Sequence, residues 1–192
     1  MTASERLGLV SQPEILDTQV LRQLGLRFLD RIVAGTNYRE SPLLRRAIAT
    51  FKYRRIRAMG EELAAVLIGA STLLDTKDEP VLCPVPLHWS RKFSRGFNQS
   101  QMLAAFVARE RGWKAVELLR RVCPTGSQVR RKRQDRLAAL RGSFRVHSGV
   151  QLPASVILVD DVSTTGATLE ECAMTLKKAG VRVVQGLVLA HG

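Results

Sequence analysis

Val156 to Thr168 reads VILVDDVSTTGAT and is the most informative stretch of the chain. The four apolar residues at its start predict a strand buried on both faces of a parallel sheet, because the run shows no polar alternation. Two carboxylates, Asp160 and Asp161, follow the strand. Small hydroxyl-bearing residues and Gly166 then predict a turn, and Leu169 begins an apolar pattern of helical period. The stretch therefore predicts a strand, a polar turn and the N-terminus of a helix.

The polar turn has the chemistry of an anion site. Backbone N–H groups in the first turn of a helix have no intrahelical partners, and the aligned peptide dipoles favour negative charge there. Threonine hydroxyls add further donors. We expect a phosphate to bind five residues of this turn: Thr164, Thr165, Gly166, Ala167 and Thr168.

The two carboxylates next to this turn suit a different part of a ligand. Ionised Asp160 and Asp161 can only accept hydrogen bonds, so they fit sugar hydroxyls or a hydrated metal ion. Together with the phosphate turn they describe a site for ribose 5-phosphate. A strand ending in two aspartates also occurs in receiver domains and phosphatases, so the assignment depends on the TTGAT run that follows.

Composition and charge limit the class of protein. The 192 residues, 45% of them hydrophobic, fit one globular domain with at most a small appendage. The net charge of +13 comes from 30 Lys and Arg against 17 Asp and Glu, and it favours polyanionic partners. Guanidinium groups bind diphosphates and nucleic acids with the same geometry, so both partners stay open.

The sequence carries no targeting or cysteine motif. No apolar run approaches the roughly 20 residues that span a bilayer, and the N-terminus lacks the pattern of a secretion signal. Cys83, Cys123 and Cys172 stand far apart without a C-x-x-C pair, which argues against a zinc ribbon or a disulfide framework. We expect a soluble, cytoplasmic protein with small buried thiols and without membrane insertion.

Helical periodicity dominates the first third of the chain. Apolar residues recur at three- and four-residue steps from Pro13 to about Ala34, which predicts a helix that ends near Gly35. Ser41 and Pro42 predict the start of a second helix, and a further helix is expected over 61–70.

A second polar turn follows the short strand predicted over 81–85. Pro84 and Pro86 force the chain out of the strand into a fixed turn, and basic residues follow. Loops at the carboxyl ends of strands form the ligand crevice of a doubly wound sheet, so this turn should face the same side as Asp160. Asn98 and Gln101 predict a capping box for the next helix, which stops at Gly112.

The region from Arg120 to Arg145 is too polar to be core. It has nine basic residues and one acid, with turn residues between them, and predicts a mobile excursion between two strands. Its densest part, Arg130 to Arg133, is a weak signal for nucleic-acid binding. The last strand is expected over 181–189.

Taken in order, these segments resemble the ComF family, also called the competence protein F or GntX-like family. The similarity covers roughly residues 38–191 and runs through TFKYRR (50–55), PVPLH (84–88), RGFNQSQMLA (95–104), the basic excursion, GSF (142–144) and VDDVSTTGAT (159–168). It implies an α/β fold like that of type I phosphoribosyltransferases, a mainly parallel sheet with helices on both faces. Residues 1–37 are then an N-terminal helical segment and 38–192 the phosphoribosyltransferase-like domain. Many members begin with a four-cysteine zinc ribbon, but residues 1–37 contain no cysteine, so we expect no zinc.

The resemblance also implies roles for the site residues. Residues 164–168 would hold the 5-phosphate of phosphoribosyl pyrophosphate, and the catalytic Asp160 and Asp161 would bind its ribose hydroxyls. Mg²⁺ would arrive with the substrate, without direct ligation by the protein. The turn of residues 84–88 would present backbone N–H groups to the pyrophosphate, and the expected pyrophosphate-binding residues are Val85, Pro86, Leu87, His88 and Arg91. The expected flexible loop contains Arg130, Arg131, Lys132 and Arg133.

Three functions remain open from the sequence. The chain could be a phosphoribosyltransferase that moves a pentosyl group to an unidentified acceptor. It could be a DNA-handling protein of natural transformation, with single-stranded DNA and competence proteins as partners. It could also sense phosphoribosyl pyrophosphate without turning it over. The phosphate turn supports the first and third functions, whereas the excess of arginine favours the second.

Overall fold

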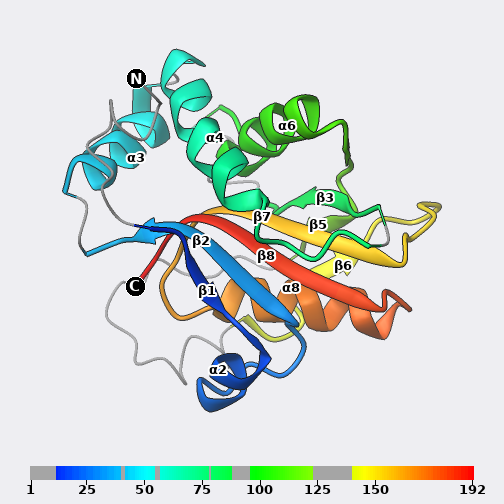
Figure 1. Cartoon of the computed structure of the whole chain (residues 1–192). Helices are drawn as coiled ribbons and strands as arrows, with labels where there is room; N and C mark the ends of the chain where they lie inside the picture. Colours follow the sequence, from blue (N-terminus) through cyan, green and yellow to red (C-terminus); the bar gives the residue numbers. More distant parts are fainter. Residues whose placement is uncertain (1–11, 40–41, 55–56, 78, 88–95, 123–139) are drawn as a thin grey trace.

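The chain folds around one mainly parallel sheet (Figure 1). The computed structural model describes residues 12–39, 42–54, 57–77, 79–87, 96–122 and 140–192. The strand order is β1-β2-β8-β7-β3-β4, and each neighbouring pair is parallel except β1 with β2. The six strands are β1 (Glu14–Leu16), β2 (Arg31–Asn37), β3 (Val81–Pro84), β4 (Lys114–Ala115), β7 (Ser155–Ser163) and β8 (Val183–His191).

Helices cover both faces of this sheet. Figure 1 shows α3 (Pro42–Arg54), α4 (Arg57–Ser71) and α6 (Gln99–Arg111) on one side of it. On the other side lie α2 (Thr18–Gln23), α8 (Ala167–Lys178) and the two-stranded sheet of β5 (Leu119–Arg121) and β6 (Phe144–Val146). The predicted α/β architecture, a mainly parallel sheet with helices on both faces, is confirmed.

Strand β7 separates two hydrophobic cores. Ile157 and Val159 belong to the core beneath α3, α4 and α6, whereas Val156 and Leu158 belong to the core beneath α8. Side chains of a strand alternate between faces, so a central strand with core on both sides needs an unbroken apolar run. The predicted doubly buried strand is therefore confirmed.

The connections that follow the neighbouring strands β3 and β7 lead toward opposite edges of the sheet. From β3 the chain passes through α6 to β4 at one edge, and from the neighbouring β7 it passes through α8 to β8, toward the other edge. Connections that leave adjacent strands in opposite directions open a crevice at the carboxyl ends of those strands. The loops that follow β3 and β7 therefore meet at this switch point.

The helix predicted from Pro13 to about Ala34 is wrong, and so is the helical character of residues 1–37 where they are described. These residues form β1, α2 and β2, and β2 pairs with β8 inside the sheet. Gly35 lies within β2, where an added Cβ would stand 2.5 Å from Val66 Cγ1. The apparent helical spacing came from apolar residues of three separate elements, and the glycine allows α4 to approach the strand.

Most other element predictions hold. Pro42 begins α3, Asn98 caps α6 by accepting from the Ser100 N–H at 3.1 Å, and Gly112 ends α6 with φ +68°. The predicted capping box does not form, because Asn98 accepts from the Ser100 N–H and not from that of Gln101, and the Gln101 side chain donates to Glu117 Oε1 at 2.6 Å. The basic excursion begins and ends in the paired strands β5 and β6, and its residues 123–139 lie outside the described ranges.

A buried carboxylate fastens the N-terminal segment to α8. Glu170 is only 8% exposed, and its Oε1 accepts from the backbone N–H groups of Arg27 and Phe28, the latter at 3.0 Å. Its Oε2 accepts from Phe28 and Leu29, each at 3.2 Å. The helix dipole also favours a negative charge in this first turn of α8.

Replacing Glu170 by alanine should therefore destabilise the fold strongly. Three backbone N–H groups would lose a charged acceptor, and we expect the free energy of unfolding to fall by about 3 kcal/mol or more. Urea denaturation measures this change. The matched control is Glu110→Ala, because Glu110 is exposed and pairs with Arg109 on the surface, so its loss should change stability by less than about 1 kcal/mol. Equal effects of the two substitutions would contradict the anchoring role of Glu170.

Candidate functional site

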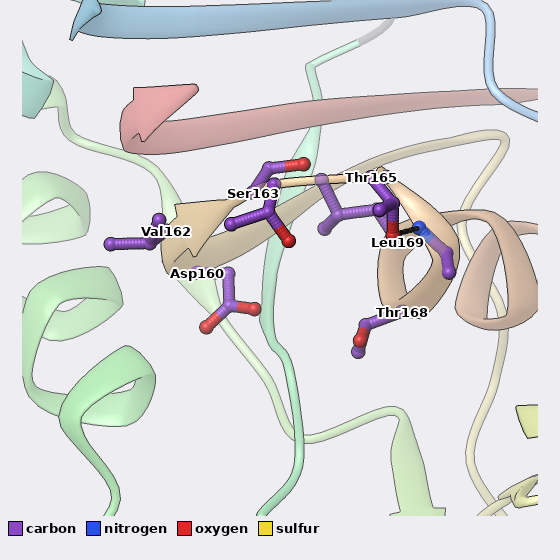
Figure 2. A pocket seen from close by; sticks show the side chains of 9 residues that line it. Asp160, Val162, Ser163, Thr165, Thr168 and Leu169 are labelled. Carbon is purple, nitrogen blue, oxygen red and sulfur yellow. Dashed lines mark hydrogen bonds between the residues drawn. The ribbon is translucent and has the colours of Figure 1, made fainter. Parts of the chain in front are cut away.

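A hollow lies where β7 passes into α8 (Figure 2). It holds about 250 Å³ of space, open to solvent, and nine residues line it: Asp160, Val162, Ser163, Thr164, Thr165, Gly166, Ala167, Thr168 and Leu169. All five residues of the predicted phosphate turn are thus brought together. Figure 2 shows the side chains of Asp160 and Thr168 on the same side of the turn.

Gly166 gives the turn its shape. It has φ +74°, a left-handed conformation that residues with a Cβ rarely adopt, and it is the N-cap of α8. An added Cβ would stand 2.5 Å from Leu26 Cδ1, so the N-terminal segment packs directly behind the turn. Thr165 Oγ1 accepts from the Ala167 N–H at 3.4 Å, a long bond that a ligand could readily replace.

The two aspartates occupy different places. Asp160 lines the hollow, and its Oδ1 accepts from Ser100 Oγ and from the Asp161 N–H, both at 2.9 Å. Asp161 is only 8% exposed and is not one of the lining residues. We expected both carboxylates to bind the ribose hydroxyls. In the structure Asp160 lines the hollow, whereas Asp161 is buried outside its lining.

The turn after β3 lies beside β7, as predicted. The Val85 N–H donates to Val159 O at 2.9 Å, and Val85 O accepts from Asn98 Nδ2 at 3.1 Å. Val85 is therefore committed to the sheet, and Pro86 has no N–H, so neither can give a pyrophosphate the backbone donor that we expected. Among the described residues of this turn, Leu87 is the one left that could donate a backbone N–H to a pyrophosphate. His88 and Arg91, the other two predicted pyrophosphate-binding residues, lie outside the described ranges. The predicted loop residues Arg130, Arg131, Lys132 and Arg133 lie outside them too.

The two described cysteines, Cys83 and Cys172, do not line the hollow. Cys83 and Cys172 are free and fully buried, as predicted for structural thiols. Burial raises the pKa of the Cys83 thiol to about 12 and raises the pKa of the Cys172 thiol well above its usual value. Both thiols therefore stay neutral at physiological pH and are poor nucleophiles. Cys123 lies outside the described ranges.

Neither a cluster of metal-binding side chains nor a membrane-spanning helix is present in the described ranges. Within them, no three His, Cys, Asp or Glu side chains gather into a group that could hold a metal ion. The helices described there are all too short or too polar to cross a bilayer.

Sequence reasoning missed three residues that support the site. Glu170 and Leu26 anchor the back of the turn, and Ser100 binds Asp160. A buried glutamate in the first helical turn and a serine after an N-cap look like ordinary solvent-facing residues in a sequence. Their partners are 60 or more residues away along the chain, and local patterns do not reveal such distances.

Replacing Gly166 by alanine should destabilise the protein more than the same change at Gly112. Both glycines have positive φ, but an added Cβ at Gly112 meets nothing within 4 Å. Gly112→Ala therefore measures the backbone strain alone, about 1–2 kcal/mol. Gly166→Ala adds the contact with Leu26, and trimming Leu26 to alanine in the same chain should relieve that excess. Urea unfolding of Gly112→Ala, Gly166→Ala, Leu26→Ala and the Gly166→Ala/Leu26→Ala double variant tests this. A Gly166→Ala cost equal to that of Gly112→Ala would refute the close contact.

Comparison with known proteins places the chain in a family. No protein-family model matches it. It is 32% identical over 164 residues to the DNA utilization protein YhgH of Salmonella typhimurium, an alignment that covers 81% of this chain and 69% of that relative. It is 36% identical over 116 residues to competence protein F of Haemophilus influenzae, covering 57% of this chain and 49% of that protein, so it spans about half of that relative's length.

Among solved structures, TT1426 from Thermus thermophilus aligns with 69% of this chain and 83% of its own at 18% identity and a TM-score of 0.39. That likeness is too low to add to the assignment. The sequence relatives are sufficient for it, because nearly a third of the residues agree over four-fifths of the chain. The chain belongs to the ComF family of competence protein F and YhgH.

Proposed function

We propose that this ComF-family chain binds phosphoribosyl pyrophosphate in the hollow after β7 and acts in the handling of DNA during its uptake. The observation that carries the ligand assignment is the placement of Asp160 beside a phosphate turn at the N-terminus of α8. The DNA role is supported by the names of two relatives, competence protein F and DNA utilization protein YhgH.

The 5-phosphate would bind the turn of residues 164–168. The backbone of this turn continues from Gly166, the N-cap, into α8. The N–H groups of the first helical turn and the positive end of the helix dipole therefore favour an anion there. The hydroxyls of Thr164, Thr165 and Thr168 add donors that line the same hollow.

The ribose would lie against Asp160. An ionised carboxylate accepts hydrogen bonds from hydroxyl groups, and Asp160 lies on the same side of the turn as Thr168 (Figure 2). If the ribose undergoes transfer, positive charge develops at its C1 as pyrophosphate leaves. The fixed negative charge of Asp160 would then stabilise that charge in a site already oriented for it.

Mg²⁺ fits this donor set as part of the substrate. The hollow offers one carboxylate and several hydroxyl oxygens, which are the hard ligands that Mg²⁺ prefers, and the ion commonly keeps its waters and substrate phosphates. Asp160 would bind the waters of the ion. The ion would neutralise charge on the pyrophosphate.

Changing Asp160 to asparagine should weaken the binding of phosphoribosyl pyrophosphate by at least about tenfold, because an acceptor of ribose hydroxyls loses its charge. Calorimetry with and without Mg²⁺ measures the affinity, and release of pyrophosphate from labelled ligand measures turnover. Asp17→Asn is the matched control, since Asp17 is an exposed N-cap of α2 and asparagine caps equally well. Unchanged affinity in Asp160→Asn would overturn the proposed site.

Binding of single-stranded DNA should be separable from binding of the small ligand. The net charge of +13 favours a polyanion, and such binding weakens with salt by a slope of about 0.7 per phosphate contact on single strands. Changing Arg130, Arg131, Lys132 and Arg133 together to alanine should reduce both the affinity and this slope. Asp160→Asn should leave DNA binding intact, as measured by fluorescence anisotropy over a salt series. Loss of DNA binding in Asp160→Asn would mean that both ligands use one site.

A further inference from the structure

The first residues of α6 are polar but buried. Asn98, Gln99 and Ser100 open this helix, and Ser100 is only 2% exposed. Burying polar groups destabilises a protein unless they find hydrogen-bond partners, and buried polar groups therefore usually have specific ones. The hydrogen-bond partners of Asn98 and Ser100 indicate why polar side chains are buried at the start of α6.

These partners come from both loops of the switch point. Asn98 Nδ2 donates to Val85 O at 3.1 Å, and Asn98 Oδ1 accepts from the Ser100 N–H at 3.1 Å. Ser100 Oγ lies 2.9 Å from Asp160 Oδ1 and must donate there, because an ionised carboxylate has no proton to give. A continuous set of hydrogen bonds thus joins the turn after β3 to the carboxylate at the end of β7.

Two donors meet on the same oxygen of Asp160. The Asp161 N–H reaches Oδ1 at 2.9 Å, as does the Ser100 hydroxyl. The backbone bond is local to β7, but the Ser100 bond comes from a helix on the other side of the crevice. With both bonds in place, the rotation of the carboxylate group is restrained. A hydroxyl that donates to an ionised carboxylate forms a charge-assisted hydrogen bond, which is stronger than a bond between two neutral groups.

We propose that Ser100 is a positioning residue that orients Asp160 toward the hydroxyls of a phosphorylated ribose. The proposal rests on the proposed function, since it assumes that a sugar phosphate occupies the hollow. Ser100 is not one of the residues that line the hollow and acts through Asp160. Its removal should therefore affect the sugar part of the ligand and leave the phosphate part unchanged.

The test compares two probes on the Ser100→Ala variant. Calorimetry should show ribose 5-phosphate binding weakened by about tenfold, whereas inorganic phosphate, which needs only the turn of residues 164–168, should bind as in the wild-type protein. Ser71→Ala is the matched control. Ser71 is also buried in a helix, where its hydroxyl donates to Ile68 O at 2.7 Å, so the control loses a buried hydroxyl away from the hollow.

A double-mutant cycle with Asp160→Ala separates positioning from a general structural effect. If Ser100 acts through Asp160, adding Ser100→Ala to Asp160→Ala should not weaken ribose 5-phosphate binding further. Additive losses, or an equal loss for ribose 5-phosphate and phosphate, would overturn the positioning role while leaving the proposed ligand in place. Wild-type protein that binds neither probe would instead overturn the proposed function, and the positioning role with it.

Discussion

The bond between the Glu170 carboxylate and the backbone of residues 27–29 determines how the first strands join the rest of the chain. Glu170 belongs to the first turn of α8, one turn after Gly166. Binding its carboxylate brings Leu26 against the glycine, at the position a Cβ would occupy. The phosphate turn therefore has a packed apolar side behind it and an open polar side before it. Packing of this kind holds the shape of the turn without a bound ligand.

The other half of the site depends on the switch point between β3 and β7. The chain leaves these neighbours for opposite edges of the sheet, so the connections at their carboxyl ends diverge and leave a crevice between them. The Val85–Val159 backbone bond ends the pairing of the two strands. At the start of α6, Asn98 donates to Val85 O on the β3 side of the crevice and Ser100 donates to Asp160 on the β7 side. Each wall of the crevice is thus held by a different helix N-terminus, α6 on one side and α8 on the other.

Sequence patterns predicted the parts of this arrangement that are local. Strand β7, the turn of residues 164–168 and α8 follow one another along the chain. Their residue types are typical of a buried strand and of a helix N-terminus, so they can be recognised locally. The first part of β2, residues 31–34, was predicted as helix because an apolar run fits either period when its neighbours are unknown. The burial of Asp161 and the bond from Ser100 to Asp160 could not be predicted, since they depend on where α6 lies relative to β7.

Asp160 also bears on how one basic chain could serve two anionic ligands. In the proposed site, the Asp160 carboxylate would repel any second phosphate that approaches without a cation, whereas it would accept hydrogen bonds from sugar hydroxyls. A DNA backbone brings many phosphates and, in its sugars, no 2′-hydroxyl. The hollow therefore suits a phosphorylated ribose better than a DNA strand. The charge that would attract DNA belongs to the surplus of arginine and lysine elsewhere in the chain, which is why the two activities should respond to different substitutions.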